Sequence, residues 1–278
     1  MKKISRRSFL AAAGLSVAAL ALTACGGSAS SVASSVASSA SSAAASTSAA
    51  AGELTTVEAG KLTMATNAAF PPYEMTTDAG EFEGIDIETA QAIADKLGLE
   101  LQIDDMDFDA ALLSVQQGKA DIVMAGVTVT DERKAVMDFS DSYATGIQSI
   151  IVPEGSDIAS PDDLAGKMIG TQRGTTGYIY CSDDFGDENV VAYDDGLTAV
   201  QALNNGQVDA VVIDNAPAQE FVAANPGLKI LDTSYAEEDY AIGMAKNSPL
   251  EDAINSALEE LKADGTLQAI VDKYITAE

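Results

Sequence analysis

From Lys61 onwards the sequence alternates between short apolar runs, typical of strands, and longer segments with the apolar spacing of amphipathic helices. In the first half the predicted strands are 61–67, 99–103 and 120–126, and the predicted helices are 85–98 and 109–118. Gly98 and Gly118 close these two helices, as glycine commonly does after the last helical turn. This alternation predicts an α/β fold with mostly parallel sheets.

The second half continues the alternation and contains an internal echo of the first. Its predicted strands include 149–153, 167–172, 189–193, 209–214 and 228–232, and its predicted helices include 197–206, 216–224 and 248–265. The segment ALLSVQQGKADIVMAG resembles AVQALNNGQVDAVVID, and the two end at Gly126 and Asp214. Ligands of open α/β sheets bind outside the carboxyl ends of strands. The echo therefore suggests two lobes with a ligand between them, although this helix-strand unit also recurs by chance.

The N-terminal region differs in composition from the rest of the chain. Residues 1–24 have a basic start and a short apolar stretch, which indicates a signal peptide, and SRRSFL resembles a twin-arginine export signal. The segment LTAC resembles a bacterial lipobox, so Cys25 is the predicted lipidation site. Residues 25–52 are rich in serine and alanine and form a predicted tether. We therefore expect an extracytoplasmic, lipid-anchored protein, exported by the twin-arginine or the general secretory route.

Charge and composition exclude several classes of function. The chain has 43 acidic and 15 basic residues and no histidine, for a net charge of −28. Such a surface repels nucleic acid. With Cys25 assigned to lipid, Cys181 alone remains, and it is predicted to be a small buried residue without a disulfide. No metal site and no cofactor are expected, and neither a GxSxG nucleophile nor a P-loop occurs.

Arg133 stands in an unusual local position. Thr130 is a predicted N-cap, and Asp131 and Glu132 suit the positive end of the short helix that follows. Arg133 then falls at the third helical position, where a cation opposes the helix dipole. On the residues alone, it either binds an external anion or pairs with Asp138 or Asp141.

Several segments together resemble the polar amino-acid substrate-binding proteins of ABC importers, bacterial extracellular solute-binding family 3. The resemblance rests on ATNAAFPPYE, GIDIETAQAIADKLG, FDAALLSVQQGKADIVMAGVTVTDERK, IGTQRGTTG and GQVDAVVIDNA, in order across residues 60 to 275. It implies a type II periplasmic binding protein fold, in which two α/β lobes close on a ligand around a hinge. Lobe 1 would comprise residues 53–145 and 240–278, and lobe 2 would comprise residues 146–239.

The resemblance also implies a zwitterion site. Arg133 matches the arginine that binds the α-carboxylate, with a planar fork suited to two parallel bonds. The backbone N–H groups of Thr128 and Thr176 would complete that site. Asp214 matches the acid that pairs with the α-ammonium, together with the Gly126 carbonyl and the Thr128 hydroxyl.

The remaining expected ligand-binding residues surround the side chain of the amino acid. Phe70 and Phe108 match aromatics that sandwich it in relatives, whereas Tyr73 and Tyr143 either line the cleft or pack in the core. Asn67 stands where many relatives carry an aspartate, which argues against a cationic side chain. The other expected members are Ala125, Gln172 and Thr175. A polar, neutral amino acid is therefore the favoured ligand, although the acidic protein as a whole attracts cations.

The resemblance implies a non-enzymatic, monomeric binding protein that delivers its amino acid to an ABC permease. One alternative is an exported cyclohexadienyl (arogenate) dehydratase-like enzyme on the same fold, which needs a catalytic carboxylate in the cleft. A second alternative is an amino-acid sensor domain, which is ordinarily fused to a membrane helix and a signalling domain. The absence of a recognisable catalytic set favours the binding protein.

Overall fold

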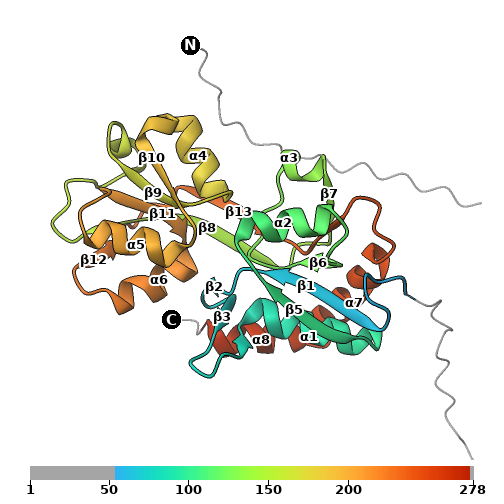
Figure 1. The fold of residues 1–278 in the computed structure, drawn as a ribbon. Helices are drawn as coiled ribbons and strands as arrows, with labels where there is room; N and C mark the ends of the chain where they lie inside the picture. The colour runs from blue at the N-terminus through green and yellow to red at the C-terminus, as the bar shows by residue number, and fades with distance from the viewer. Residues whose placement is uncertain (1–53, 276–278) are drawn as a thin grey trace, which may run out of the picture. The chain divides into compact units, whose positions relative to one another are not determined.

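A computed structural model describes residues 54–275, which belong to one compact unit. The predicted signal peptide, Cys25 and the predicted tether lie outside the described residues. Two large sheets, each covered by helices, form two lobes within this unit (Figure 1). The predicted two-lobed α/β fold is confirmed.

Lobe 1 is built on a five-stranded sheet that contains the beginning and the end of the described chain. The strand order is β5 (Glu100–Asp105), β1 (Lys61–Thr66), β6 (Ile122–Val123), β14 (Gly243–Ala245) and β7 (Met137–Phe139). A small separate sheet contains β2 (Ala69–Phe70), β3 (Glu74–Thr76) and β4 (Phe82–Glu83). The helices are α1 (Ile85–Leu97), α2 (Phe108–Gln116), α3 (Asp131–Lys134), α7 (Glu251–Ala263) and α8 (Thr266–Tyr274). Helices α7 and α8 pack against α1, so the C-terminal helices belong to lobe 1.

Lobe 2 is built on a six-stranded sheet. Five strands follow the order β10 (Val190–Tyr193), β9 (Ile169–Gln172), β11 (Ala210–Asp214), β8 (Ala144–Pro153) and β12 (Leu228–Ile230), and β13 (Ala236–Tyr240) also pairs with β8. The helices are η1 (Pro161–Leu164), α4 (Thr176–Phe185), η2 (Asp187–Asn189), α5 (Gly196–Asn204) and α6 (Asn215–Ala224). Strands β9 and β11 end at Gln172 and Asp214, on the side that faces lobe 1 (Figure 1).

The sheets are mixed, so the prediction of mostly parallel sheets is wrong. Strand β1 runs parallel to β5 and β6, and β9 runs parallel to β10 and β11. Strand β14 is antiparallel to its neighbours in lobe 1, and β8 is antiparallel to β11, β12 and β13. These antiparallel strands carry the chain between the lobes or back into the first sheet. Their direction depends on that long-range path and not on local sequence.

Strands β8 and β13 connect the lobes as an antiparallel pair (Figure 1). The crossing points expected near Gly146 and near Tyr240 lie within these two strands. Gly146 faces Glu238 in this register, and a Cβ added at Gly146 would lie 2.5 Å from the ring of Tyr240. The Tyr240 ring therefore lies directly against the bare backbone of Gly146, which makes the connection compact.

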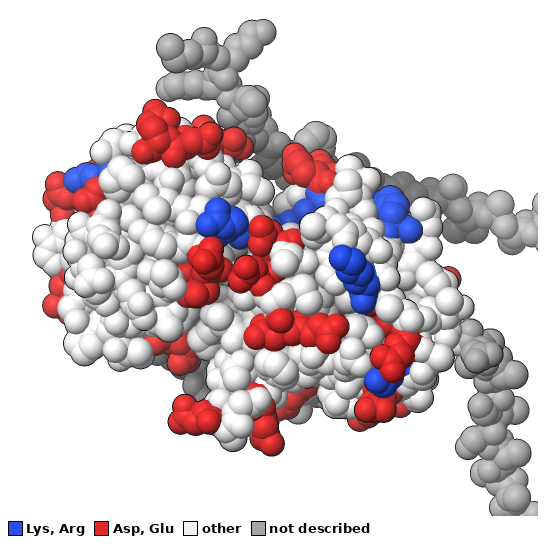
Figure 2. Space-filling model, viewed as in Figure 1, with Lys and Arg blue, Asp and Glu red and all other residues white. Residues whose placement is uncertain are grey.

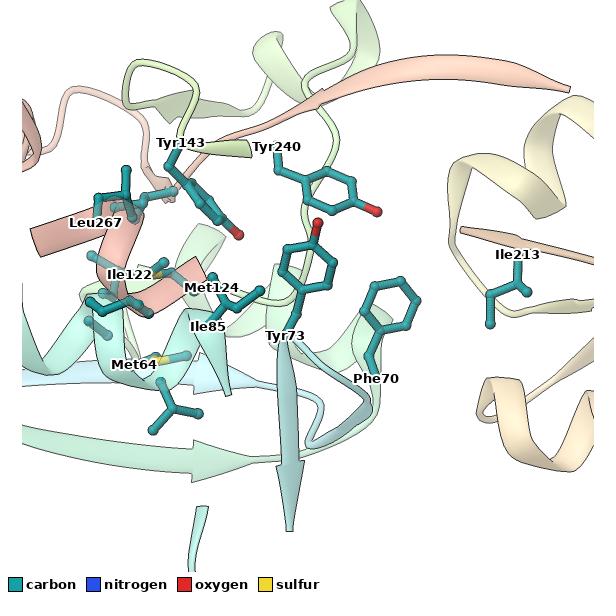
Figure 3. Packing of buried hydrophobic residues seen from close by; sticks show 14 of the residues in the cluster. Met64, Phe70, Tyr73, Ile85, Ile122, Met124, Tyr143, Ile213, Tyr240 and Leu267 are labelled. Carbon is teal, nitrogen blue, oxygen red and sulfur yellow. The ribbon is translucent and has the colours of Figure 1, made fainter. Parts of the chain in front are cut away.

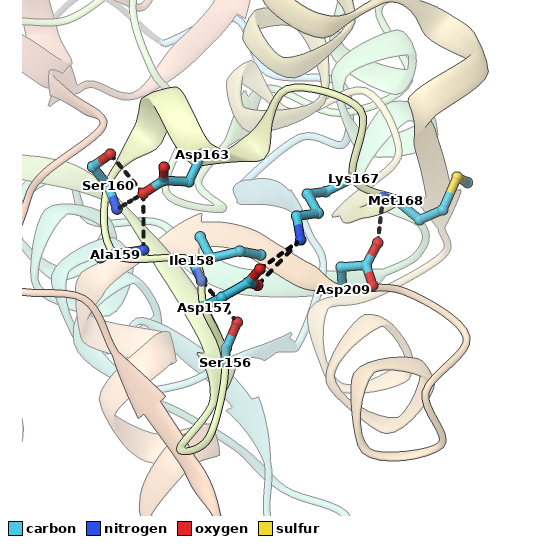
Figure 4. A network of polar contacts seen from close by, with 9 residues as sticks. All are labelled: Ser156, Asp157, Ile158, Ala159, Ser160, Asp163, Lys167, Met168 and Asp209. Atoms are coloured by element: carbon cyan, nitrogen blue, oxygen red, sulfur yellow. Dashed lines mark hydrogen bonds and ion pairs between the residues drawn. The ribbon is translucent and has the colours of Figure 1, made fainter.

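A network of polar side-chain contacts holds the loop between β8 and β9 (Figure 4). One carboxylate oxygen of Asp163 accepts hydrogen bonds from Ser160 N and Ser160 Oγ, each 2.9 Å long. The helical segment η1 is a single 3-10 turn, because Ala165 leaves the helical conformation (φ −58°, ψ 118°). Lys167 pairs with Asp157 at 3.1 Å, and Asp209 accepts from Met168 N at 2.8 Å.

Several local predictions on the described residues are confirmed. Gly98 takes the left-handed conformation after α1, and its N–H bonds to the last turn of the helix. Cys181 is fully buried, and burial raises the pKa of its thiol to about 12. Acidic side chains are spread over the face drawn in Figure 2 and outnumber basic ones there. No helix within residues 54–275 has both the length and the apolar character needed to cross a membrane.

Candidate functional site

One cavity is lined by every ligand-binding residue expected from the sequence. Its lining consists of Asn67, Phe70, Glu74, Phe108, Ala125, Gly126, Thr128, Arg133, Gln172, Thr175, Thr176 and Asp214. Gln172, Thr175, Thr176 and Asp214 come from lobe 2, and the others come from lobe 1. The structure therefore brings the eleven predicted residues together between the lobes and adds Glu74.

Local helix capping positions Arg133 in this cavity. The Thr130 hydroxyl accepts a hydrogen bond from Arg133 N at 3.2 Å, as expected for an N-cap. The guanidinium donates through Nη1 to the Thr128 carbonyl at 2.8 Å and through Nη2 to the Gly174 carbonyl at 3.1 Å. It also lies over the Phe108 ring, 5.4 Å from the centroid. Contacts from both lobes thus fix the guanidinium.

Arg133 is buried without a carboxylate partner. Its exposed fraction is only 8 %, and among residues 54–275 it takes part in no ion pair. Asp138 instead pairs with Lys246 at 2.5 Å. Burial lowers the pKa of Arg133, and the negative charge of Glu238 opposes that effect. Because a buried cation needs a compensating anion, the geometry suits a site for an external carboxylate.

Thr128 and Thr176, which line the same cavity as Arg133, also offer backbone N–H groups as donors. Thr128 forms a bridge with Tyr240 in which Val129 N and Ala241 N donate, so the Thr128 N–H takes no part in it. Thr176 is the first residue of α4, where the backbone N–H has no partner within the helix. The α4 dipole also favours an anion at this end.

Asp214, at the end of β11, lies in an acidic part of the cavity wall. The Tyr240 hydroxyl donates to Asp214 Oδ1, and Gln148 Nε2 donates to Asp214 Oδ2 at 2.8 Å. Burial raises the pKa of Asp214 to about 7, the bond from Tyr240 lowers it, and the neighbouring Glu238 raises it again. A ligand cation beside Asp214 would favour its ionised form.

Glu238, on the connecting strand β13, joins the two lobes through hydroxyl groups. Its Oε2 atom accepts from Thr128 Oγ1 at 3.1 Å and from Thr176 Oγ1 at 2.9 Å. Gln148 Nε2, on the other connecting strand, donates to the same atom at 3.1 Å. Glu238 thus links a lobe 1 threonine, a lobe 2 threonine and both connecting strands.

Aromatic side chains form the apolar part of the wall. Phe70 and Phe108 both line the cavity and are 7 % and 6 % exposed. Phe70 and Tyr240 lie on the side of lobe 1 that faces Ile213 of lobe 2 (Figure 3). Tyr73 packs edge-on against Tyr240, with ring centroids 5.2 Å apart. Tyr73 is therefore a core residue, which settles the choice left open by the sequence.

Two amides that line the cavity are bonded to the protein. Asn67 Nδ2 donates to the Met106 carbonyl at 2.9 Å, and Asn67 Oδ1 accepts from Gln172 Nε2 at 2.8 Å. Gln172 Nε2 also donates to the Asp194 carbonyl at 3.3 Å. These bonds hold Asn67 of lobe 1 and Gln172 of lobe 2 together across the cavity.

Glu74 and Asp86 form a buried acidic pair at the cavity wall. Both side chains are 0 % exposed. Asp86 Oδ2 accepts from Gly126 N at 3.0 Å and from the Tyr143 hydroxyl at 2.8 Å, so Tyr143 also packs in the core. Burial raises the pKa of Asp86 to about 6 and, together with the Asp86 charge, raises the pKa of Glu74 well above its ordinary value.

Sequence reasoning did not find the residues that support this site. Glu74, Asp86, Gln148, Glu238 and Tyr240 were absent from the predicted set. The signal that was available is the motif FPPYE, which places Glu74 within the segment of the resemblance. Gln148 and Glu238 on the connecting strands had no such signal, because their partners are distant in sequence. Asp214 lies 66 residues from Gln148. Thr176 and Thr128 lie 62 and 110 residues from Glu238.

Two lobes that enclose a cavity with a buried arginine and a buried aspartate define a hinged solute-binding protein. The chain belongs to the bacterial extracellular solute-binding proteins, family 3, which match residues 62–277. It is accordingly an extracytoplasmic amino-acid-binding protein of the kind that serves ABC transporters.

Individual amino-acid-binding proteins resemble this chain in sequence and in structure. The chain is 33 % identical over 226 residues to the L-cystine-binding protein TcyJ of Escherichia coli K12, covering 80 % of this chain and 85 % of that protein. It is 33 % identical to the arginine-binding extracellular protein ArtP of Bacillus subtilis, covering 78 % and 87 %. The arginine-, lysine-, histidine-binding protein ArtJ of Geobacillus stearothermophilus has a similar structure, with a TM-score of 0.75 and 34 % identity over 78 % of this chain and 96 % of that one.

These comparisons confirm the predicted family, fold and solute-binding role. The relatives are binding proteins, and they support neither the dehydratase nor the sensor alternative. Among residues 54–275 no group of three or more acidic, cysteine or histidine side chains is arranged to hold a metal ion.

Proposed function

We propose that this protein captures a polar amino acid by its zwitterionic end, with Arg133 binding the α-carboxylate and Asp214 binding the α-ammonium. Thr128 N and Thr176 N supply further donors to the carboxylate, and the Gly126 carbonyl and the Thr128 hydroxyl accept from the ammonium. Phe70, Phe108, Ala125 and Thr175 enclose the rest of the ligand.

The buried guanidinium of Arg133, with no carboxylate partner within residues 54–275, carries this proposal. A charged group in such a place is costly unless an anion joins it. A buried cation and a buried acid in the lining of one cavity suit an amino acid better than a simple acid or amine. The relatives named for binding cystine and arginine support the same ligand class.

Closure of the lobes is the proposed mechanism. Lobe 1 comprises residues 53–145 and 240–278, and lobe 2 comprises residues 146–239, with β8 and β13 acting as the hinge. A ligand held by Arg133 from one side and Thr176 and Asp214 from the other stabilises the closed state through its differential affinity for the two states. An ABC permease then recognises the closed, loaded form of a monomeric protein.

Export and anchoring complete the proposal. Residues 1–24 direct export, with the paired Arg6 and Arg7 compatible with the twin-arginine route, and Cys25 becomes lipidated. Residues 25–52 tether the folded unit to the membrane. Multiple acyl chains on Cys25 satisfy the requirement of two hydrophobic signals for stable anchoring.

The side chain of the amino acid is a separate question. Asn67 carries no charge, and on that residue alone a neutral side chain such as that of glutamine is favoured over a cationic one. The protein is not an enzyme in this proposal, because the cavity is assigned to recognition groups alone.

Thermal unfolding of the purified protein with each of the twenty amino acids, cystine and ornithine tests the proposal. We expect one or a few of these ligands to raise the unfolding temperature by several degrees. Arg133→Ala, measured alongside, is expected to lose that effect. A protein that no amino acid stabilises, or one that Arg133→Ala leaves fully responsive, would contradict the proposed zwitterion site.

A further inference from the structure

A second hollow lies beside the strands that connect the lobes. Its lining includes Thr128 and Lys134 of lobe 1, Tyr180 of lobe 2 and residues 237–239 of β13. Helix α3 of lobe 1 and helix α4 of lobe 2 stand on the same side of the connecting strands (Figure 1). Of these residues only Thr128 also lines the cavity that contains Arg133. We refer to this hollow as the hinge groove.

Glu238 gives the hinge groove a buried acceptor that is not used within the protein. Its side chain is 7 % exposed, and it lines the groove but not the amino-acid cavity. Oε2 accepts from the hydroxyls of Thr128 and Thr176 and from the amide of Gln148. Oε1 is buried and has no hydrogen-bond donor among residues 54–275. Because a buried carboxylate oxygen ordinarily has a partner, Oε1 points to a ligand that brings a donor.

Tyr180 places lobe 2 beside the same carboxylate. Burial and the neighbouring Glu238 raise the pKa of the Tyr180 hydroxyl, so the two groups lie close together. This hydroxyl nevertheless leaves Oε1 without a donor. A ligand that reaches Oε1 therefore lies between Tyr180 of lobe 2 and Thr128 of lobe 1, and its contacts depend on the relative position of the lobes.

The charge of the hinge groove defines the class of that ligand. Three consecutive acids, residues 237–239, line the groove together with one basic residue, Lys134. Glu237 and Asp239 are exposed, so they attract a cation to the groove, and Glu238 offers the buried oxygen. Within the described chain no acidic cluster is arranged to hold a metal ion. An organic ammonium ion supplies both the positive charge and the N–H donor that Oε1 lacks.

Glu238 also connects the hinge groove electrostatically to the amino-acid cavity. Its negative charge raises the pKa of Asp214 and opposes the lowering of the pKa of Arg133 by burial. A cation paired with Glu238 offsets that charge. Asp214 then ionises more readily, and Arg133 loses part of its internal compensation. Both changes favour a zwitterion in the cavity.

We propose that the hinge groove is an effector site for a small organic ammonium ion, which binds Glu238 Oε1, contacts both lobes and tightens the binding of the amino acid. The coupling rests on the proposed function, because it acts through Arg133 and Asp214, whereas binding in the groove does not. By linkage, the amino acid tightens the binding of the ammonium ion by the same factor.

Putrescine and tetramethylammonium form a suitable pair of probes, because both are small organic cations but only putrescine has N–H donors. Titration calorimetry of the full chain would measure the Kd of the most stabilising amino acid with an excess of either probe, at equal ionic strength. We expect putrescine to lower this Kd about fivefold or more and tetramethylammonium to leave it unchanged. A higher Kd with putrescine would mean competition for the cavity and would overturn the inference, as would equal effects of the two probes.

Glu238→Gln keeps a polar group beside the two threonine hydroxyls and removes the charge. The ratio of the Kd values without and with putrescine is expected to fall to nearly one in this variant. Glu220→Gln, at an exposed acid on α6 of lobe 2, is the matched control and should keep the ratio. A putrescine effect that persists in a folded Glu238→Gln variant would contradict the assignment.

A second measurement on the unaltered protein requires neither a variant nor an amino acid. In amide correlation spectra, putrescine alone should shift the signals of Val129, Tyr180 and Glu238 and leave those of Phe70 and Phe108 in place. Shifts at the two phenylalanines alone, or no shifts, would overturn the inference while leaving the proposed function intact. If the groove signals respond but no amino acid binds, the groove site is supported and the proposed function is contradicted.

Discussion

The carbonyl oxygen of Gly174 in lobe 2 accepts a hydrogen bond from Nη2 of Arg133 in lobe 1, with a donor–acceptor distance of 3.1 Å. Through Nη1 the same guanidinium bonds to Thr128 of its own lobe. Arg133 thus contributes to contact between the lobes as well as to the proposed anion site. Substitutions on either side of this bond should therefore affect closure and binding together.

The planar fork of Arg133 is the first group to test. Arg133→Lys keeps a positive charge but cannot make two parallel bonds to a carboxylate. At roughly 1.5–3 kcal/mol for each charge-assisted bond, we expect the loss of one bond to raise the Kd about 10- to 100-fold. Titration calorimetry with the best ligand measures this. Arg173→Lys, at an exposed arginine that pairs with Asp194, is the control and should change the Kd little.

The affinity for an amino acid should depend on pH through Asp214. Its pKa is raised to about 7 in the empty protein, and in the proposed site the α-ammonium pairs with its ionised form. Below pH 7 ligand binding must therefore remove a proton from Asp214, so affinity is expected to fall as the pH is lowered. The slope approaches tenfold per pH unit when one proton is exchanged.

Calorimetry between pH 5.5 and 7.5 would measure this slope. Asp214→Asn should bind much more weakly and show little pH dependence, because no proton remains to be removed at that position. An affinity that stays constant across this range in the unaltered protein would argue against Asp214 as the partner of the ammonium.

Stability of the unliganded protein should change with pH in the opposite direction. Asp86 and Asp214 have pKa values of about 6 and about 7 in the folded state, both raised from 3.8. Between pH 3.8 and these raised values, the folded state therefore binds more protons than the unfolded state. Stability is then greatest at the acidic end of this interval and falls as the pH rises toward 7.

The interval from pH 5 to 8 isolates these groups. Acids with lowered pKa values, such as Asp138 and Asp264, are already ionised in both states above pH 5. We expect urea unfolding to show a free energy that decreases by a few kcal/mol from pH 5 to 8. Asp214→Asn should flatten the upper part of that decrease. A free energy of unfolding that rises over this interval would contradict the proposed proton binding.

Much of the site was accessible from sequence for identifiable reasons. Arg133 attracts attention because a cation at the start of a helix opposes the dipole, and Asp214 because it ends a strand that echoes another. The rest of the lining came from the resemblance, which places each residue in a known order. These signals are local or ordered along the chain.

What could not be predicted depends on contacts between distant segments. Nothing near Glu74 in the sequence shows that Asp86 and the cavity remove it from water. Gln148 and Glu238 meet because β8 and β13 pair, although they lie 90 residues apart. The antiparallel direction of β8 and β14 likewise results from the crossing of the chain between lobes. Buried polar networks of this kind require the tertiary structure.

Gly146 should be a sensitive position in the connection between the lobes. A Cβ there would lie 2.5 Å from two atoms of the Tyr240 ring and 2.6 Å from its hydroxyl oxygen. Gly146→Ala must displace that ring, and overpacking of this kind costs about 1–3 kcal/mol. Because the Tyr240 hydroxyl donates to Asp214, ligand affinity should weaken together with stability. Thermal unfolding and calorimetry measure both effects. Gly155→Ala, with no neighbour within 4 Å of the added Cβ, should leave both unchanged.

Gly174 allows closure to be tested apart from backbone strain. Gly174 and Gly166 both have φ +76°, so alanine at either position carries a similar local penalty. At Gly174 the added Cβ would also lie 3.2 Å from Asp109 Cβ of lobe 1, whereas at Gly166 it would meet nothing within 4 Å. Gly174→Ala should therefore oppose closure and Gly166→Ala should not.

The two alanine variants should lose similar stability in the absence of ligand but differ in binding. If the contact with Asp109 costs about 1 kcal/mol in the closed state, Gly174→Ala raises the Kd roughly fivefold. Gly166→Ala should keep the original Kd. Small-angle scattering with and without saturating ligand would report whether Gly174→Ala shifts the lobes toward an open arrangement. Equal Kd values for the two variants would show that the contact between Gly174 and Asp109 does not limit closure.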